Sequence, residues 1–204
     1  MASTDPLILA SASPRRTELL SALGIRHDVV PARSPEPEHG SEPAAEHARL
    51  SALAKASEVA ALHPGRLVLG ADTVVSVGPS AADVLGKPAD REDAARMLGL
   101  LSGREHDVVT GVALVRVETH ATRERVRSAS TLVTFRELPP SLIRRLVATE
   151  EPLDKAGAYA IQGLIATHVA GIDGSWSNVV GLPQELLPEL FADLGLDLAD
   201  WQGW

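Results

Sequence analysis

The sequence predicts an α/β protein built from alternating strands and helices. Short apolar runs rich in β-branched residues are separated by longer stretches rich in leucine and alanine, which is the pattern of such folds. The chain has 204 residues, enough for one sizeable core or for two lobes around a cleft. It contains no internal repeat and no linker, so we expect residues 1–204 to form a single domain.

The first elements follow from short local signals. LILA, residues 7–10, is apolar and too short for a helix, so it predicts a buried strand. A helix is expected next, with Ser13 as its N-cap, Pro14 in its first turn and Gly24 as its stop signal. HDVV, residues 27–30, predicts a second strand.

A loop, a helix, a strand and a second helix come next. Residues 31–43 contain four prolines and several carboxylates and predict a loop. The alanine-rich stretch 44–62 predicts a helix. Residues 66–77, RLVLGADTVVSV, predict a central strand because they are apolar and dense in β-branched residues. Another helix is expected from about residue 91 to 101.

Two long strands and a helix dominate the next part of the chain. Residues 106–118 and 126–138 predict strands, and the polar segment 119–125 between them suggests a hairpin connection. Residues 139–149 begin with two prolines and predict a short helix.

The C-terminal part is less regular. Residues 151–163 combine turn residues with small side chains, and residues 163–174 predict one more strand. The stretch 182–196 predicts a helix, and we expect the tail, residues 197–204, to be peripheral.

The overall composition restricts the possible functions. A net charge of −8 argues against nonspecific nucleic-acid binding, although a local cationic pocket can still bind a small anion. The chain has no cysteine, which excludes disulfides, thiolate metal sites and cysteine nucleophiles. Its beginning does not resemble a signal peptide, and no stretch approaches the roughly 20 apolar residues of a membrane span. We therefore expect a cytoplasmic protein without membrane contacts.

Lysine is rare in this chain. Lys55, Lys87 and Lys155 are the three lysines among 19 basic residues, and the other sixteen are arginines. An ammonium group is a compact charge with three rotatable donors, which suits a phosphate where a planar guanidinium does not fit. The simpler alternative is that an arginine-rich composition has left a few lysines at random positions.

The segment SASPRR, residues 11–16, lies where the first predicted strand gives way to a helix. The N-terminus of a helix offers unpaired N–H groups and partial positive charge to an anion. Ser11, Ser13, Arg15 and Arg16 would add hydroxyl and guanidinium donors there. The alternative is an ordinary capped helix with solvated arginines.

Asp72 stands inside the apolar run LVLGADTVV. Burial of a carboxylate is costly without partners, and such a residue is often a metal ligand or a catalytic base. The alternative is an aspartate at a strand end that accepts a hydrogen bond from a loop. Thr73 points to the other face of the strand, or to the same site if the strand ends there.

Three further polar residues lie in turn-like contexts where α/β proteins often bind ligands. Lys87 in LGKP and Lys155 in LDKAG are candidate phosphate ligands, and Gln162 in AIQG has an amide that can read the edge of a base. Each of them, taken alone, is more often an ordinary turn residue.

Other polar residues favour structural roles. Ser175, Ser177 and Asn178 precede or begin a short helix, where capping is their commoner role. His106 and His168 are isolated and are interpreted as structural. The motifs of P-loop enzymes, dinucleotide-binding folds and esterase elbows are missing.

Six segments of the chain share a pattern with a known family. They are LILASASPRRTELLSALGI, VLGADTVV, LGKPAD, LSGREHDVVTGVAL, EPLDKAGAYAIQG and GSWSNVVGLP. Taken together, they resemble the Maf family of nucleoside triphosphate pyrophosphatases. They run from about residue 7 to 183 in the order of the family, which makes the resemblance specific.

The resemblance implies a bent mixed β-sheet with flanking helices and two lobes around a central cleft, as in inosine triphosphate pyrophosphatases. It also implies hydrolysis between the α- and β-phosphates to a nucleoside monophosphate and pyrophosphate, with Mg²⁺ or Mn²⁺ and possible homodimers. Asp72 matches the proton acceptor and, with Glu36, a metal ligand. Substrate-binding positions fall on Ser11, Arg15, Arg16, Lys55, Thr73, Lys87, Lys155 and Gln162.

The base preference comes from the same comparison. Arg15, Thr73 and Gln162 match the branch that prefers dTTP and UTP. The acidic pair of the family appears here as Pro35 and Glu36, and Leu164, Ile165 and Trp176 also depart from its pattern. Two other functions are considered: a nucleotide-sensing regulator linked to cell-division control, and a monophosphatase, which would release orthophosphate.

Overall fold

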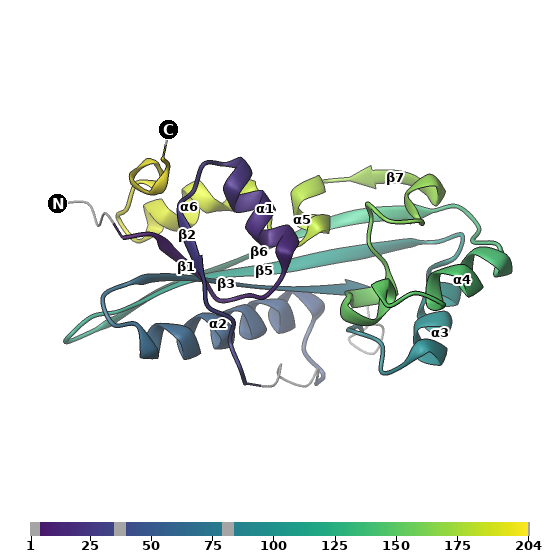
Figure 1. Ribbon diagram of the computed structural model, residues 1–204, viewed down its shortest axis with the longest axis horizontal. Helices are drawn as coiled ribbons and strands as arrows, with labels where there is room; N and C mark the ends of the chain where they lie inside the picture. Colours follow the sequence, from purple (N-terminus) through teal and green to yellow (C-terminus); the bar gives the residue numbers. More distant parts are fainter. Residues whose placement is uncertain (1–4, 35–39, 79–83, 204) are drawn as a thin grey trace.

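A single mixed sheet forms the centre of the computed structural model, which describes residues 5–34, 40–78 and 84–203 (Figure 1). The strand order is β2-β1-β3-β5-β6-β7, and β4 also pairs with β3. β1, β2 and β3 are parallel, and the remaining pairs are antiparallel. The strands are β1 (Leu7–Leu9), β2 (His27–Val29), β3 (Leu67–Ser76), β4 (Val84–Leu85), β5 (Glu105–Val117), β6 (Thr122–Phe135) and β7 (Val169–Asp173).

Helices cover both faces of this sheet. α2 lies along one face, and α1, α5 and α6 lie on the other, while α3 and α4 are at one end of the molecule (Figure 1). Short 3-10 turns connect several elements, among them η2 (Glu151–Asp154) and η3 (Ala156–Ala158). The α-helices are α1 (Pro14–Ala22), α2 (Ala44–Leu62), α3 (Arg91–Leu101), α4 (Pro140–Val147), α5 (Trp176–Val180) and α6 (Leu187–Asp193).

The apolar side chains gather at the two ends of the sheet. One cluster joins α3, α4 and η3 to the end of β3, with Leu98, Leu101 and Ala158 fully buried. The clusters at the other end join β1 and β3 to α6 on one face and to α2 on the other. These two lobes on one continuous sheet, with a cleft between them, confirm the predicted fold class.

One edge of β3 is only partly paired. β5 pairs with β3 along its whole length, from Leu67 to Ser76. On the opposite edge β1 pairs at residues 68–69 and β4 pairs at residues 75–76. Within the described ranges, residues 70–74 of β3 therefore have no neighbouring strand on this edge. The cleft opens at this interruption, outside the carboxyl end of β1, where α/β proteins commonly bind ligands.

Three local predictions need correction. Residues 122–125 belong to β6, so the hairpin connection is only residues 118–121, because the register continues from Val117 opposite Thr122. Residues 163–168 form turns, and strand β7 begins at Val169. The tail is not peripheral: Trp201 is 2% exposed and packs edge-to-face against Phe191.

Candidate active site

The main cleft has a volume of about 840 Å³ and is lined by residues from both lobes. It brings together eight of the predicted site residues: Ser11, Arg15, Arg16, Lys55, Asp72, Thr73, Lys87 and Lys155. Gln162 lies in a small adjoining recess of about 30 Å³, which also contains Arg15. Glu36 falls outside the described residues.

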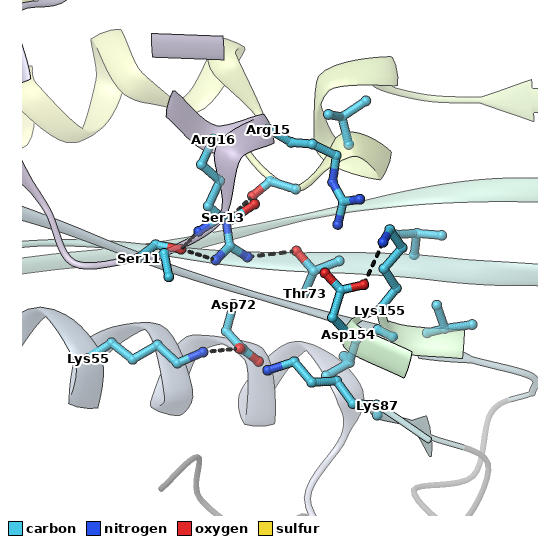
Figure 2. A pocket seen from close by; sticks show the side chains of 18 of the residues that line it. Ser11, Ser13, Arg15, Arg16, Lys55, Asp72, Thr73, Lys87, Asp154 and Lys155 are labelled. Carbon is cyan, nitrogen blue, oxygen red and sulfur yellow. Dashed lines mark hydrogen bonds and ion pairs between the residues drawn. The ribbon is translucent and has the colours of Figure 1, made fainter. Parts of the chain in front are cut away.

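Asp72 forms an ion pair with Lys55 at the floor of the cleft. The Lys55 Nζ donates to Asp72 Oδ1 at 2.6 Å, and both side chains are largely buried (Figure 2). Asp72 lies in the middle of β3 rather than at a strand end, which rules out the alternative proposed from the sequence. In the part of the chain that the structure describes, its second oxygen accepts no hydrogen bond.

Close packing of α2 on the sheet makes this ion pair possible. The sheet residues under the helix are Gly70 in β3 and Gly111 in β5. A Cβ atom on Gly70 would overlap the Ala52 carbonyl oxygen, and a Cβ atom on Gly111 would overlap the Ala48 carbonyl oxygen. The two glycines therefore let the helix backbone approach the strands closely enough for Lys55 to reach Asp72.

Arg16 is buried beneath the opposite side of the cleft. Its guanidinium donates to the Ser11 hydroxyl at 2.8 Å, the Gly181 carbonyl at 2.8 Å and the Thr73 hydroxyl at 3.2 Å. Arg16 thus joins the start of α1, strand β3 and the end of α5. Ser13 occupies the N-cap position of α1 as predicted, but its hydroxyl makes no capping hydrogen bond.

Thr73 points away from Lys55, toward Arg16. Its hydroxyl lies 2.9 Å from that of Thr110, directly across the β3–β5 ladder, and Thr110 donates to the Asn178 carbonyl at 3.0 Å. Because the edge of β3 is open, side chains on both of its faces reach the same cleft. This resolves the orientation that the sequence left open.

Lys87 and Lys155 reach the cleft from two loops of the other lobe. The Gly157 N–H donates to the Gly86 carbonyl at 3.1 Å, which ties these loops together. Lys155 Nζ donates to the Glu151 carbonyl at 2.7 Å and to Asp154 at 2.5 Å. Lys87 points toward Asp72 (Figure 2).

The remaining sequence interpretations concern structural roles. Ser175 caps α5 by accepting from the Asn178 N–H, as expected. His106 is buried and shares a hydrogen bond with Tyr159. His168 ends a short 3-10 turn and lies outside the residues that line the cleft.

Some cleft residues were not predicted from the sequence. His47 lies on α2 two turns before Lys55, a spacing that places both side chains on one helix face and could have indicated it. Asp154 adjoins Lys155 and supplies a second carboxylate. Tyr159 lines both the cleft and the recess, and no signal in its segment distinguished it from a core aromatic residue.

The charges of the cleft are strongly unbalanced. Among the described residues that line it, five are cationic and two, Asp72 and Asp154, are carboxylates, so these seven carry a formal charge of three positive units. The whole chain carries −8, so the positive charge is concentrated locally. No group of three or more histidine, aspartate or glutamate side chains suited to a metal occurs within residues 5–34, 40–78 and 84–203.

The fold and this cleft define an α/β protein with clustered basic side chains in a cleft between two lobes. A family profile described as Maf-like protein matches residues 6–194. The chain belongs to this Maf-like family.

Proteins of similar sequence match this chain over nearly its whole length. The dTTP/UTP pyrophosphatase of Moorella thermoacetica is 52% identical over 94% of this chain and 96% of its own length. That of Myxococcus xanthus is 49% identical over 94% of both chains. A solved HAM1 protein from Coxiella burnetii is 17% identical with a TM-score of 0.42, covering 66% of this chain and 74% of that one.

No helix in the described part of the chain is both long and apolar enough to cross a membrane.

Proposed function

We propose that this protein hydrolyses the bond between the α- and β-phosphates of nucleoside triphosphates, releasing a nucleoside monophosphate and pyrophosphate. dTTP and UTP are its preferred substrates. The observation that supports this most directly is the convergence of four further cationic side chains around the Lys55–Asp72 pair in one cleft. The relatives from Moorella thermoacetica and Myxococcus xanthus are dTTP/UTP pyrophosphatases, which is in line with this activity.

Asp72 acts as the general base in this proposal. Its Oδ1 is held by Lys55, so the carboxylate has a fixed position with its second oxygen available on the cleft side. A water molecule gives its proton to Asp72 while its oxygen bonds to the α-phosphorus. The bond from this phosphorus to the bridging oxygen breaks, and pyrophosphate leaves with the bonding electrons.

The basic residues bind the polyphosphate. Lys87 and Lys155 approach from one lobe and Arg15 from the other, so the chain of phosphates can lie between them. Their charges stabilise the negative charge that develops on the departing pyrophosphate. Arg16 donates hydrogen bonds to Ser11, Thr73 and Gly181, so its main role is to hold these three residues around the substrate.

A divalent cation, Mg²⁺ or Mn²⁺, fits the donor chemistry of the cleft. Mg²⁺ is commonly held by one or two carboxylates together with substrate phosphates and water. Asp72 is the carboxylate on the cleft floor, and Glu36 remains a predicted second ligand outside the described residues. When bound, the cation would neutralise phosphate charge and polarise the phosphoryl oxygens.

Arg15 and Gln162 account for the proposed pyrimidine preference. They lie together in the recess beside the cleft, where an amide and a guanidinium can bind the polar edge of a base. Thr73 contributes to this preference indirectly. Its hydroxyl accepts a hydrogen bond from Arg16, which lies at the same side of the cleft as Arg15.

The experiment is a panel of nucleoside triphosphates incubated with the protein and Mg²⁺, with pyrophosphate and orthophosphate measured separately. The proposal predicts stoichiometric pyrophosphate and monophosphate, fastest with dTTP and UTP. Orthophosphate as the first product would instead indicate a monophosphatase-type reaction. Tight nucleotide binding without release of either product would favour a sensor.

A further inference from the structure

The wall between the cleft and the recess is apolar and aromatic. Tyr159, Val179 and Val180 line both spaces together with Arg15, whereas Lys55, Lys87 and Lys155 line only the main cleft. The recess has a volume of about 30 Å³, far smaller than the roughly 840 Å³ of the main cleft. The larger space beside this wall is therefore the main cleft, which has room for the ring of a base.

Tyr159 is held rigidly in the wall. Its hydroxyl lies 2.8 Å from His106 Nε2, and its ring meets those of Phe135 and His106 edge-on, with centroid distances of 4.9 Å and 5.5 Å. The His106 and Phe135 rings meet in the same way at 4.7 Å. These three rings, defined here as the aromatic triad, have one member on the cleft.

The backbone before Tyr159 adopts a strained conformation. Gly157 and Ala158 both have left-handed φ values, +66° and +61°. For alanine this costs on the order of 1 kcal/mol or more, and such strain is often found near functional sites. The turn directs Lys155 to the phosphate region and Tyr159, four residues later, to the wall.

Both polar members of the triad are kept neutral. Burial lowers the pKa of His106 to about 4. Burial also raises the pKa of the Tyr159 hydroxyl well above its usual value. The hydrogen bond between them is therefore unchanged across the neutral pH range, and it fixes the ring without adding charge beside the base.

We propose that Tyr159, with Val179 and Val180, forms the surface on which the base and sugar of the substrate pack, and that His106 is the positioning residue that holds this surface. The inference rests on the proposed nucleotide activity and extends it to substrate specificity. Aromatic and aliphatic surface binds the faces of a base, while Arg15 and Gln162 bind its edge.

The test compares Tyr159→Leu, His106→Leu and His106→Gln with the wild type. The first two variants should raise the KM for dTTP and UTP about five- to twentyfold and change kcat less than about threefold. His106→Gln keeps a side chain able to hydrogen-bond the phenol, so its KM should stay within about threefold of the wild type.

Inorganic triphosphate separates this role from general damage. It carries the phosphates without a nucleoside, so its inhibition constant should be unchanged in all three variants. Phe191→Leu, which alters a buried aromatic residue in the other lobe, should leave both constants unchanged. Unchanged KM for dTTP in folded Tyr159→Leu protein, or a parallel rise in the inhibition constant of triphosphate, would overturn the inference.

Two further measurements keep the outcome unambiguous. If a leucine variant does not fold, Tyr159→Phe replaces it. This variant retains the ring and loses the hydrogen bond, so its KM should increase about two- to fivefold. An unchanged KM would contradict the role of His106.

If the wild type releases no pyrophosphate, the proposed function fails. The wall is then tested by calorimetry with α,β-methylene-dTTP, whose binding should weaken in Tyr159→Leu and whose unchanged binding would refute it.

Discussion

Gly111 lies directly opposite Asp72 in the β3–β5 ladder, and the backbone of α2 rests on it. A residue without a side chain is therefore paired with the proposed general base. Together with Gly70, it sets the distance between the helix that carries Lys55 and the strand that carries Asp72. The chemistry of the cleft thus depends on helix–sheet packing underneath it.

Gly111→Ala should weaken both stability and activity. The added methyl group has to displace the α2 backbone near Ala48, and overpacking of this kind usually costs about 1–3 kcal/mol. Because Lys55 moves with the helix, turnover should fall roughly tenfold to a hundredfold. Urea unfolding and pyrophosphate release check the two effects.

Gly99→Ala is the matched control. A Cβ atom on Gly99 would have no neighbour within 4 Å, and the residue lies in α3, where alanine favours the helix by roughly 0.5–1 kcal/mol. The control should be slightly more stable and equally active. Wild-type activity in Gly111→Ala protein would show that the close approach of α2 is irrelevant to the site.

Thr110→Val should loosen the Arg16 side of the cleft. The substitution preserves shape but removes the hydroxyl that links Thr73 to the Asn178 carbonyl in a fully buried position. We expect a loss of about 1–3 kcal/mol and a higher KM, because Thr73 and α5 lose a shared partner. Thr134→Val, on the half-buried surface of β6, should have a much smaller effect in the same denaturation and kinetic assays.

The stability of the protein should fall in mild acid because of His106. Its pKa is about 4 in the folded protein, against an ordinary value of 6.5, so between these values the unfolded chain binds a proton that the folded protein does not. This contribution is fully present above pH 6.5 and lost as the pH falls toward 4. The difference between the two pKa values corresponds to about 3 kcal/mol in the free energy of unfolding.

His106→Gln isolates this effect, because glutamine does not titrate. The difference in the free energy of unfolding between wild type and variant should shift by most of this amount between pH 7 and pH 4.5, with the wild type losing more. Denaturation curves at several pH values measure it. Parallel pH profiles for the two proteins would show that His106 is not buried as a neutral group.

Trp201→Ala should destabilise the fold by about 3–5 kcal/mol, the usual cost of truncating a fully buried large aromatic residue. Trp201 packs against Phe191, and the Gln202 backbone bridges to Ile25. Trp176→Ala changes a side chain that is 46% exposed and should cost far less. Equal melting temperatures for Trp201→Ala and the wild type would contradict this packing.

Local signals predicted most of the elements, and contacts between elements were harder to predict. The helix at residues 44–62 was predicted correctly because its composition and the flanking prolines and glycine are local features. That Trp201 is buried could not be predicted, because it depends on α6 and Ile25 coming together in space.

The same holds for the candidate site: several of its residues could be identified from the sequence, but most of their contacts could not. The family resemblance identified Lys55 and Asp72 as residues of one cleft, but their direct ion pair follows from the seating of α2 on two glycines. Asp154 and Tyr159 were missed because their place on the cleft depends on how distant loops meet, whereas the helical spacing of His47 and Lys55 was a local signal that was not used. The orientation of Thr73 depended on the interrupted edge of β3.

The most direct test of the central claim is the turnover of Asp72→Asn with saturating dTTP, measured as pyrophosphate release. Asparagine keeps the size of the side chain but cannot accept the proton from water, so kcat should fall about 10²- to 10⁴-fold. Asp107→Asn, on β5 but outside the cleft and bonded to Ser130, is the matched control and should keep its rate. Release of pyrophosphate by folded Asp72→Asn protein at the wild-type rate would show that Asp72 is not the general base.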